Sequence, residues 1–281
     1  MGILSGLSDL GLGKLEGADL YEKEEKPVEK KEPVVAPQVQ TAKETDFIFE
    51  KTYECVVCGK SFKESTVKTG RARLIKQDPD LRPVFNGIDT IKYDVISCPY
   101  CGYSALSKYY GSIAAPQAKL IKENISKNFI KFPRNMVVSY DEAIDRFRLA
   151  LANSIVKKAK DSEKAYICLR MAWVIRGKRE NLDPNTEGYD DVRAELIDDE
   201  AELLHNALDG FVSARQSETF PIAGMDEITL DYLLSVLFVK EGDIDNASKL
   251  VGKILASKSA NNRMKERARE LKELILARKK Q

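Results

Sequence analysis

The hydrophobic pattern of the chain changes period once, from two residues to about 3.6. In the first half, apolar residues alternate with polar ones in two stretches, at 47–53 and at 91–95. Alternation of this kind is typical of β-strands with one buried face. Between the stretches, Asp78-Pro79 and Asn86-Gly87 are turn signals. We therefore expect the intervening segment to form further strands or a hairpin. The alternating apolar residues are Phe47, Phe49 and Tyr53, followed by Ile91, Tyr93 and Val95.

From Pro116 onward the apolar spacing predicts helices. The first carries its apolar face on Ile121, Ile125 and Phe129 and is expected to end at Pro133. Ser139, with Glu142 three residues later, is a capping box that opens the next helix. Gly177 stands where a helix would take its C-cap. The later helices are expected over 162–176, 190–217, 226–241, 244–257 and 260–280.

The pattern predicts three segments. Residues 1–20 mix leucines with glycines, and residues 21–45 are rich in charge and proline. We expect residues 1–45 to form a disordered tail and linker; for residues 1–20 the alternative is a short peptide that becomes ordered on a partner or a membrane surface. A small β domain follows at 46–115 and a helical domain at 116–281. The expected fold class is α+β, mainly α.

Composition excludes several classes of protein. Charged residues make up 32% of the 281 residues, but the net charge is only +1, so no global field favours nucleic acid or membrane. No stretch reaches the length of apolar residues that a transmembrane helix needs. The N-terminus lacks the basic and apolar regions of a secretory signal. We therefore expect a cytoplasmic, reducing location, where paired cysteines favour metal over disulfides. The sequence does not indicate an oligomeric state.

Four of the five cysteines form two C-x-x-C-G motifs, Cys55 with Cys58 and Cys98 with Cys101. Two matched pairs of thiols are typical of a structural zinc site, because four thiolates complete a tetrahedron and leave no open position for catalysis. Two strands that deliver two such turns to one ion predict a module like a zinc ribbon, with one Zn²⁺ per chain. The alternatives are two unrelated pairs of thiols or a redox dithiol. The fifth, Cys168, lies among apolar neighbours and is expected to be buried.

Three other features of the sequence contain charged or titratable side chains: a basic segment, a single histidine and a run of carboxylates. The segment Lys60–Lys76 holds six cations against the single anion Glu64, which could contact phosphates or simply form a solvated face. The lone histidine, His205, lies in a helical stretch without a catalytic motif around it. Asp198, Asp199 and Glu200 are consecutive and so point around a helix. No phosphate-binding, dinucleotide-binding, esterase or metalloprotease motif occurs. We expect a protein that is not an enzyme.

Two helical segments resemble tetratricopeptide repeats. One carries Ala143, Phe147 and Ala150 at the diagnostic spacing of a second repeat helix. The other departs at Asp231, where the repeat prefers tryptophan, and otherwise matches at Leu234, Ser235, Phe238, Ala247, Val251 and Ile254. An ordinary irregular helical bundle is the alternative, since it uses the same packing chemistry. Trp173 is expected in the core; the alternative is a surface position that contacts a partner.

The order of motifs along the chain resembles a bacterial family, domain of unknown function 2225. The resemblance covers roughly residues 45–260 and implies a cytoplasmic bacterial protein with a zinc-ribbon-like front and a tetratricopeptide-like back, without an established activity. The segments that carry it are Tyr53-x-Cys55-x-x-Cys58-Gly59-Lys60-x-Phe62, Tyr93-Asp94-Val95-x-x-Cys98-Pro99-x-Cys101-Gly102-Tyr103, Leu169-Arg170-x-Ala172-Trp173 and Phe220-Pro221-x-x-Gly224-Met225-Asp226-Glu227.

Taken together, these patterns favour a zinc-binding adaptor that carries no catalytic group and binds a protein or peptide on its helical part. The main alternative is a nucleic-acid-binding protein that uses the zinc module and the basic segment Lys60–Lys76.

Overall fold

The structure is a computed structural model that describes residues 43–131 and 134–279. The first half of this part of the chain forms three two-stranded antiparallel hairpins. They pair β1 (Ile48–Glu54) with β2 (Ser61–Val67), β3 (Leu74–Gln77) with β4 (Pro83–Phe85), and β5 (Val95–Ser97) with β6 (Ser104–Leu106). The expected strand before the first cysteine pair and the expected hairpin between the two pairs are both present. The tail predicted at 1–45 lies largely outside the described residues.

The strand expected from the alternation of Ile91, Tyr93 and Val95 is shorter than predicted. Residues Thr90–Tyr93 form a 3₁₀ helix, η4, and only Val95–Ser97 are extended. The cause is local: the side chain of Asp89 accepts a hydrogen bond from the backbone N–H of Ile91 and so caps a helical turn. Of the two turn signals, Asp78-Pro79 closes the β3–β4 hairpin, whereas Asn86-Gly87 follows β4 instead of closing a hairpin.

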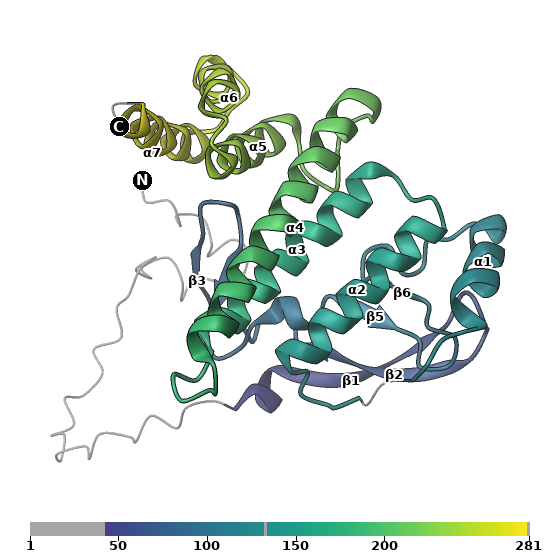
Figure 1. The fold of residues 1–281 in the computed structure, drawn as a ribbon. Coiled ribbons are helices and arrows are strands. Elements are labelled where there is room, and N and C mark those ends of the chain that lie inside the picture. Colours follow the sequence, from purple (N-terminus) through teal and green to yellow (C-terminus); the bar gives the residue numbers. More distant parts are fainter. Residues whose placement is uncertain (1–42, 132–133, 280–281) are drawn as a thin grey trace, which may run out of the picture. The chain divides into compact units, whose positions relative to one another are not determined.

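Helices make up the second half (Figure 1). The first helical segment consists of α1 (Ala115–Ile121) and a π-helical turn, Lys122–Ser126, and therefore ends well before the predicted end at Pro133, a residue outside the described part. The others are α2 (Tyr140–Val156), α3 (Asp161–Glu180), α4 (Tyr189–Ser217), α5 (Glu227–Glu241), α6 (Ile244–Ala256) and α7 (Asn262–Arg278). Apart from α3, their bounds lie within two residues of those predicted. The fold is α+β and mainly α.

Of the predicted caps, the N-cap at Ser139 is present: its side chain accepts a hydrogen bond from the backbone N–H of Glu142. Gly242, which was not predicted as a cap, ends α5 in the left-handed conformation. The carboxylate of Glu142 does not complete the capping box but pairs with Arg146. Gly177 is not a C-cap, because α3 continues to Glu180. A Cβ at Gly177 would lie 2.6 Å from Asp89 Oδ2, so this glycine permits a close approach of η4 to α3.

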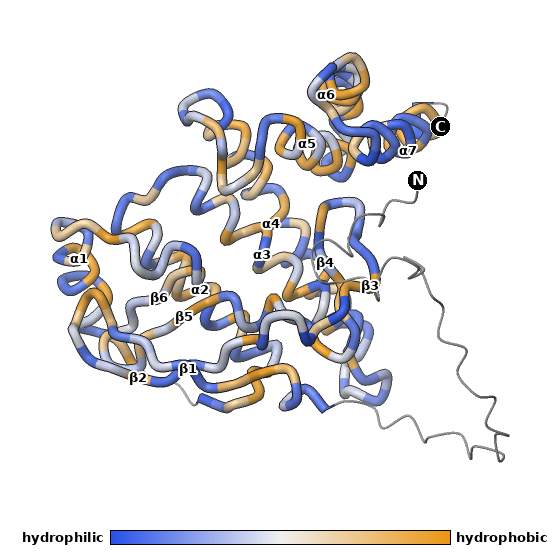
Figure 2. Tube along the Cα trace, turned by 180° about the vertical axis from the view of Figure 1, so that it is seen from behind, coloured by the Kyte–Doolittle hydropathy of each residue, from blue (hydrophilic) through white to orange (hydrophobic). Residues whose placement is uncertain are grey.

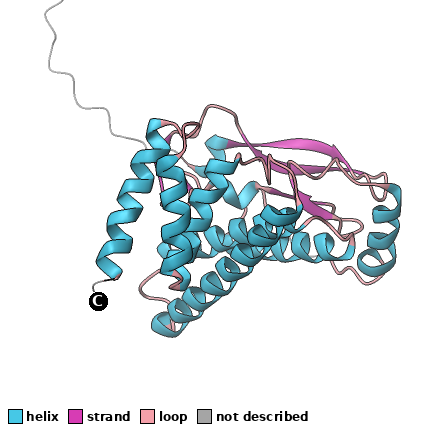
Figure 3. Ribbon diagram, turned by 90° about the horizontal axis from the view of Figure 1, so that it is seen from above, coloured by secondary structure: helices cyan, strands magenta, loops and turns pink. Residues whose placement is uncertain are grey.

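One hydrophobic core connects the hairpins with the helices. It includes Ile91 and Val95 from the first half, Phe147 from α2, Trp173 from α3 and Phe211 from α4. The hairpins lie along one side of the helices (Figure 3), and α2 packs on β5 and β6. The predicted boundary after residue 115 therefore separates segments that share this core, and the described residues fall within one compact unit.

A second core surrounds the cysteines, and a third lies between α5, α6 and α7. Hydrophobic residues dominate α5 and hydrophilic ones dominate α7 (Figure 2), which fits a helix buried on most sides and a helix with one apolar stripe. Among the described residues, none of the helices combines the length and apolar content that crossing a bilayer requires.

Buried ion pairs tie the hairpins to the helices. Glu64 on β2 accepts hydrogen bonds from Arg146 on α2, at 2.9 Å, and from Arg134. Asp80, in the β3–β4 turn, pairs with Arg176 on α3. Burial alone would raise the pKa of Asp80, but the guanidinium of Arg176 more than offsets it and holds that pKa below its usual range. These side chains keep their charge inside the fold because each has a partner.

Candidate metal centre

Each C-x-x-C motif forms the turn of a β-hairpin. Cys55 and Cys58 lie between β1 and β2, and Cys98 and Cys101 lie between β5 and β6. The two turns, called here the first and second knuckle, repeat one hydrogen-bond pattern: the N–H of Gly59 donates to Cys55 O at 2.7 Å, and the N–H of Gly102 donates to Cys98 O at 3.1 Å. Both glycines have φ of +73°, a conformation that other residues adopt at a cost. The glycine after each motif is thus required by the turn.

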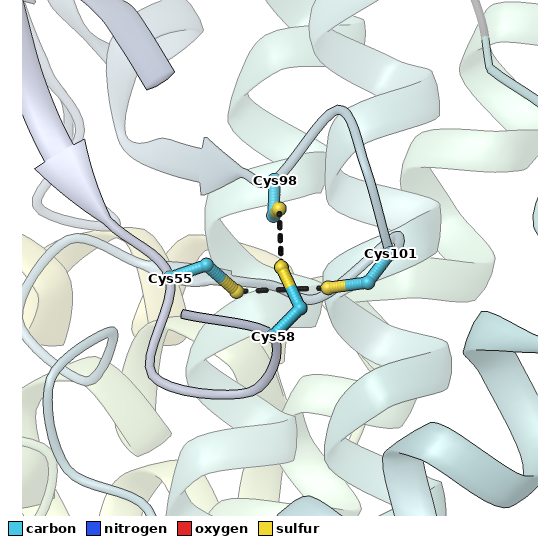
Figure 4. A group of neighbouring side chains, drawn as sticks. All are labelled: Cys55, Cys58, Cys98 and Cys101. Carbon is cyan, nitrogen blue, oxygen red and sulfur yellow. Dashed lines mark hydrogen bonds between the residues drawn. The ribbon is translucent and has the colours of Figure 1, made fainter. Parts of the chain in front are cut away.

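The two knuckles bring four sulfurs to one point (Figure 4). Cys55 Sγ lies 3.6 Å from Cys101 Sγ, and Cys58 Sγ lies 3.7 Å from Cys98 Sγ. All four sulfurs are within 4.8 Å of one another, and none forms a disulfide. A regular tetrahedron of sulfurs at about 2.3 Å from a central Zn²⁺ has edges of about 3.8 Å. The observed separations therefore fit a four-coordinate thiolate site, and the predicted grouping of the four cysteines is confirmed.

Backbone amides and the thiols themselves set the electrostatics of the site. A hydrogen bond from Cys101 is the largest of the effects that lower the pKa of Cys55, and the N–H groups of Val57 and Cys58 lower it further. The same hydrogen bond raises the pKa of Cys101. Four thiols this close cannot all ionise without a cation between them, because adjacent thiolates repel one another. The arrangement thus calls for a positive ion.

Aromatic rings enclose one side of the four sulfurs. The rings of Tyr103 and Tyr110 lie 4.9 Å apart, and Phe62 and Tyr53 pack against Tyr110 at 6.3 and 6.1 Å. The hydroxyl of Tyr103 donates to Tyr110 O at 2.9 Å. Burial, and after it the charge of Cys55, raises the pKa of Tyr110. These rings form an apolar layer beside the sulfurs, which limits the access of water to them.

The two knuckles differ in how they are covered. At the second knuckle, Asn153 on α2 donates to Gly102 O at 3.0 Å, and a Cβ at Gly102 would lie 2.5 Å from the ring of Phe129. At the first knuckle, none of the described atoms lies within 4 Å of a Cβ at Gly59. Each knuckle has one exposed residue between its cysteines, Val56 at 44% and Tyr100 at 45%. The glycine of the second knuckle is therefore packed against α2 and Phe129, whereas the glycine of the first is open.

The sequence did not identify Asn153, Phe129 or Tyr110 as neighbours of the cysteines. Phe129 was placed on a helical face, and it instead follows the π-helical turn. One indication of these neighbours is present in the sequence: Tyr103 follows directly after Cys101-Gly102, and it is fully buried beside the sulfurs. Asn153 gave no signal, because its role depends on how α2 packs on the second knuckle.

The remaining candidate residues do not join this site. Cys168 is buried in α3, and burial raises the pKa of its thiol to about 11. His205 is exposed on α4, with Nδ1 at 3.2 Å from Glu241 Oε2. Glu200 turns inward to pair with Arg176 and Arg179, away from the exposed Asp198. As expected, the consecutive carboxylates do not converge.

The basic segment Lys60–Lys76 is spread over β2, the following loop and β3. Two of its cations are paired, Lys63 with Glu50 and Lys76 with Asp78, each at 3.3 Å. Arg71 and Arg73 are exposed and have no side-chain partner in the described part of the chain. The segment is therefore a partly neutralised surface.

Comparison with known proteins identifies a family. The family model described as "Uncharacterized protein conserved in bacteria (DUF2225)" matches residues 48–275. No curated protein and no solved structure matches the chain. The structure brings two motifs of the resemblance together, because Asp94 pairs with Arg170 across the joint between η4 and α3. With most of its length matched by this model, the chain belongs to the bacterial DUF2225 family.

Proposed function

We propose that this protein is a zinc-binding adaptor of the cytoplasm, without a catalytic group of its own. The observation that carries the proposal is the closed set of four cysteine sulfurs. Among biological metals, Zn²⁺ fits a tetrahedral tetrathiolate without imposing a redox reaction. Four protein ligands leave no position for water or substrate, so the ion would hold the two knuckles together and supply folding energy.

Metal analysis tests the zinc assignment. Purified protein should contain about one zinc ion per chain, and Cys98→Ser should lose most of it. Cys168→Ser is the matched control, because this thiol is remote from the cluster and should leave the zinc content unchanged. Protein without metal, with four titratable thiols and an unchanged fold, would contradict the assignment. If the protein contained iron instead of zinc, the four cysteines would still be the metal ligands, but the identity of the metal would be wrong.

The adaptor role rests on the helical part. The hairpin of α5 and α6 buries Ala247, Val251 and Ile254, the positions that match a tetratricopeptide repeat. Ala143, Phe147 and Ala150 on α2 are likewise buried. We interpret these helices as a repeat-like platform, in which small residues let neighbouring helices approach and large ones fill the space between them.

A groove between α4, α5 and α6 is the surface on this platform that best fits a protein segment. Its volume is about 270 Å³, and its apolar residues are Val212, Leu234, Phe238 and Leu250. Arg215 and Lys249 lie among them. Apolar side chains that are accessible beside a few polar groups are typical of a surface that binds the side chains of a peptide.

The test is a capture experiment with the intact protein, in which bound proteins and nucleic acids are both identified. Val212→Arg with Leu250→Arg should release the specific protein partner; because both side chains also pack against the main core, helical circular dichroism and zinc content must show that the variant is folded. Leu276→Arg, at an exposed position of α7, is the control for added charge. Retention of every partner by the groove variant would contradict the proposal.

Nucleic-acid binding is the second candidate, and the unpaired side chains of Arg71 and Arg73 favour it. In the same experiment, recovery of nucleic acid that decreases steeply with salt and is lost on Arg71→Ala with Arg73→Ala would support it over the adaptor.

A further inference from the structure

The first knuckle forms one wall of a second groove, separate from the groove on the helical platform. The groove is lined by Val56 and Val57 of the knuckle, by Ile113 before α1 and by Ala118 in α1. The groove encloses about 470 Å³. We call it the knuckle groove.

Most apolar residues of the knuckle groove are accessible to a partner, and Val57, at 4% exposure, forms its buried base. Val56 is 44% exposed at the tip of the first knuckle. Ile113 and Ala118 are half-buried, and Ala115 is exposed. An isolated exposed valine needs no explanation, but several apolar side chains around one concave surface mark a place where another apolar side chain can bind.

The charge of the knuckle groove has one sign. Lys119 and Lys122 line it, and no carboxylate does. Lys119 Nζ lies 3.9 Å from Glu123, but both side chains are largely exposed, and a pair of this kind is weak. Lys122 has no side-chain partner in the described part of the chain. The positive charge at the rim is therefore available to a ligand.

The second knuckle also carries positive charge, outside the lining of the knuckle groove. Tyr100, which is 45% exposed, lies beneath two ammonium groups: Lys60 Nζ at 5.0 Å and Lys131 Nζ at 5.6 Å from the ring centroid. Both knuckles thus have lysines beside an exposed apolar or aromatic side chain.

We propose that the knuckle groove binds a segment of a partner protein in which one apolar side chain is flanked by carboxylates. The apolar side chain would fill the space between Val56 and Ile113, and the carboxylates would pair with Lys119 and Lys122. Single-stranded nucleic acid fits less well, because neither an aromatic ring nor an arginine lines the groove and bases need such surfaces for stacking.

This surface differs from the groove between α4 and α6, so the proposal goes beyond the adaptor role argued above. A protein with both surfaces could hold two partners at once, because the two grooves share no lining residue. Because the first knuckle is itself a wall of the groove, the shape of the groove depends on the metal centre that holds the knuckle in place.

The proposal is tested with six fluorescein-labelled peptides, each with two acidic residues on either side of a central Leu, Ile, Val, Met, Phe or Trp. Binding to the full-length, zinc-loaded protein is measured by fluorescence anisotropy. At least one peptide should bind. Lys119→Glu with Lys122→Glu should weaken that binding by about tenfold. Val56→Ser should also weaken it, because it removes apolar contact area.

Two controls separate docking from a general effect of charge or folding. Lys258→Glu with Lys272→Glu makes the same change in net charge at exposed positions near α6 and on α7, and should leave binding unchanged. A twin peptide with lysines in place of its acidic residues should bind only the protein with Lys119→Glu and Lys122→Glu. Zinc content and melting temperature confirm that each variant is folded.

The proposal is wrong if none of the six peptides binds, or if binding is unaffected by both Val56→Ser and the Lys119 and Lys122 changes. Tight binding of a labelled single-stranded oligonucleotide that the peptides cannot displace would assign the groove to nucleic acid. The variant Val212→Arg with Leu250→Arg should still bind the acidic peptide. The experiments therefore distinguish a failure of the proposal for the helical groove from a failure of the proposal for the knuckle groove.

Discussion

The two knuckle glycines show how one backbone requirement can have two different consequences. Gly59 and Gly102 have the same φ of +73° and occupy the same position in their turns. Around Gly59 the space is open, whereas the ring of Phe129 fills the space at Gly102. The first position therefore demands glycine for its backbone conformation alone, and the second demands it for both conformation and packing.

Gly59→Ala should lower the free energy of unfolding by about 1–2 kcal/mol, the cost of a left-handed conformation for a residue with a Cβ. Gly102→Ala should cost a further 1–3 kcal/mol or so, because its Cβ would overlap the ring of Phe129. Denaturant unfolding of the zinc-loaded proteins measures both. Adding Phe129→Ala to Gly102→Ala should remove the part that comes from overlap. Equal costs at the two glycines would mean that Phe129 moves aside freely.

At this scale the sequence predicted the grouping of the four cysteines and little of its surroundings. The spacing C-x-x-C-G is a property of a local turn, so the sequence alone identifies Cys55, Cys58, Cys98 and Cys101. Asn153 and Phe129 contact the second knuckle from far along the chain. Contacts of that kind depend on tertiary packing, which the spacing of residues in the sequence does not predict.

At the scale of elements, the joint between η4 and α3 depends on a pair that crosses the two halves of the chain. Arg170 Nε lies 2.6 Å from Asp94 Oδ2. The guanidinium also stacks on Trp173 at 5.2 Å and on Tyr166 at 5.6 Å. Asp94 is the C-cap of η4 and Arg170 lies in the middle of α3. One side chain thus fixes both the end of the 3₁₀ helix and its distance from the helix behind it.

Asp94→Ala should lower the free energy of unfolding by about 2–3 kcal/mol, because it leaves the guanidinium of Arg170 largely buried and without its carboxylate. Arg170→Met should cost a similar amount. The double variant should cost less than the sum of the two, and the difference measures the pair. The exposed pair of Lys63 and Glu50 is the matched control, with an expected cost below about 1 kcal/mol. Additive effects at Asp94 and Arg170 would show that the pair does not couple the two elements.

Helix limits were predictable where the signal lies within the segment. Ser139, Asp226 and Asp243 each accept a hydrogen bond from a backbone N–H near the start of a helix, as the chemistry of N-caps predicts. Gly177 carries the same local signature as a C-cap, yet α3 continues past it. At this position glycine is required because the side chains of Asp89 and Tyr140, on other elements, occupy the space that a Cβ would fill. The sequence around Gly177 does not indicate those contacts.

At the scale of the whole molecule, the described residues form one unit whose core was not predictable from periodicity. The alternating and helical patterns indicated two domains, because period identifies the type of an element and not the surface on which it packs. The structure joins them through a shared core and through the ion pairs of Glu64, Asp80 and Asp94. The four-cysteine cluster therefore belongs to the same compact unit as the helices.

The start of this unit can be located by truncation. The first described element, η3 (Glu44–Phe47), begins two residues before the predicted start of the folded part at Asp46. Glu44 Oε1 lies 2.8 Å from Lys92 Nζ and accepts a hydrogen bond from the hydroxyl of Tyr93 at 2.7 Å. Lys92 is only 6% exposed, and Phe47 belongs to the main core. A short segment at the N-terminal edge thus neutralises a buried cation.

A chain that begins at Lys43 should keep the melting temperature and zinc content of the full protein, because the glycine, proline and charge of residues 1–42 offer little surface for a core. A chain that begins at Ile48 should lose at least about 3 kcal/mol, since Lys92 would be buried without its carboxylate and Phe47 would be gone. Glu44→Gln in the full chain separates the two causes, because it removes the charge and keeps Phe47. Thermal and denaturant unfolding measure all four proteins. A large loss for the chain that begins at Lys43 would show that residues 1–42 contribute to stability, and an unchanged chain from Ile48 would show that Glu44 and Phe47 do not.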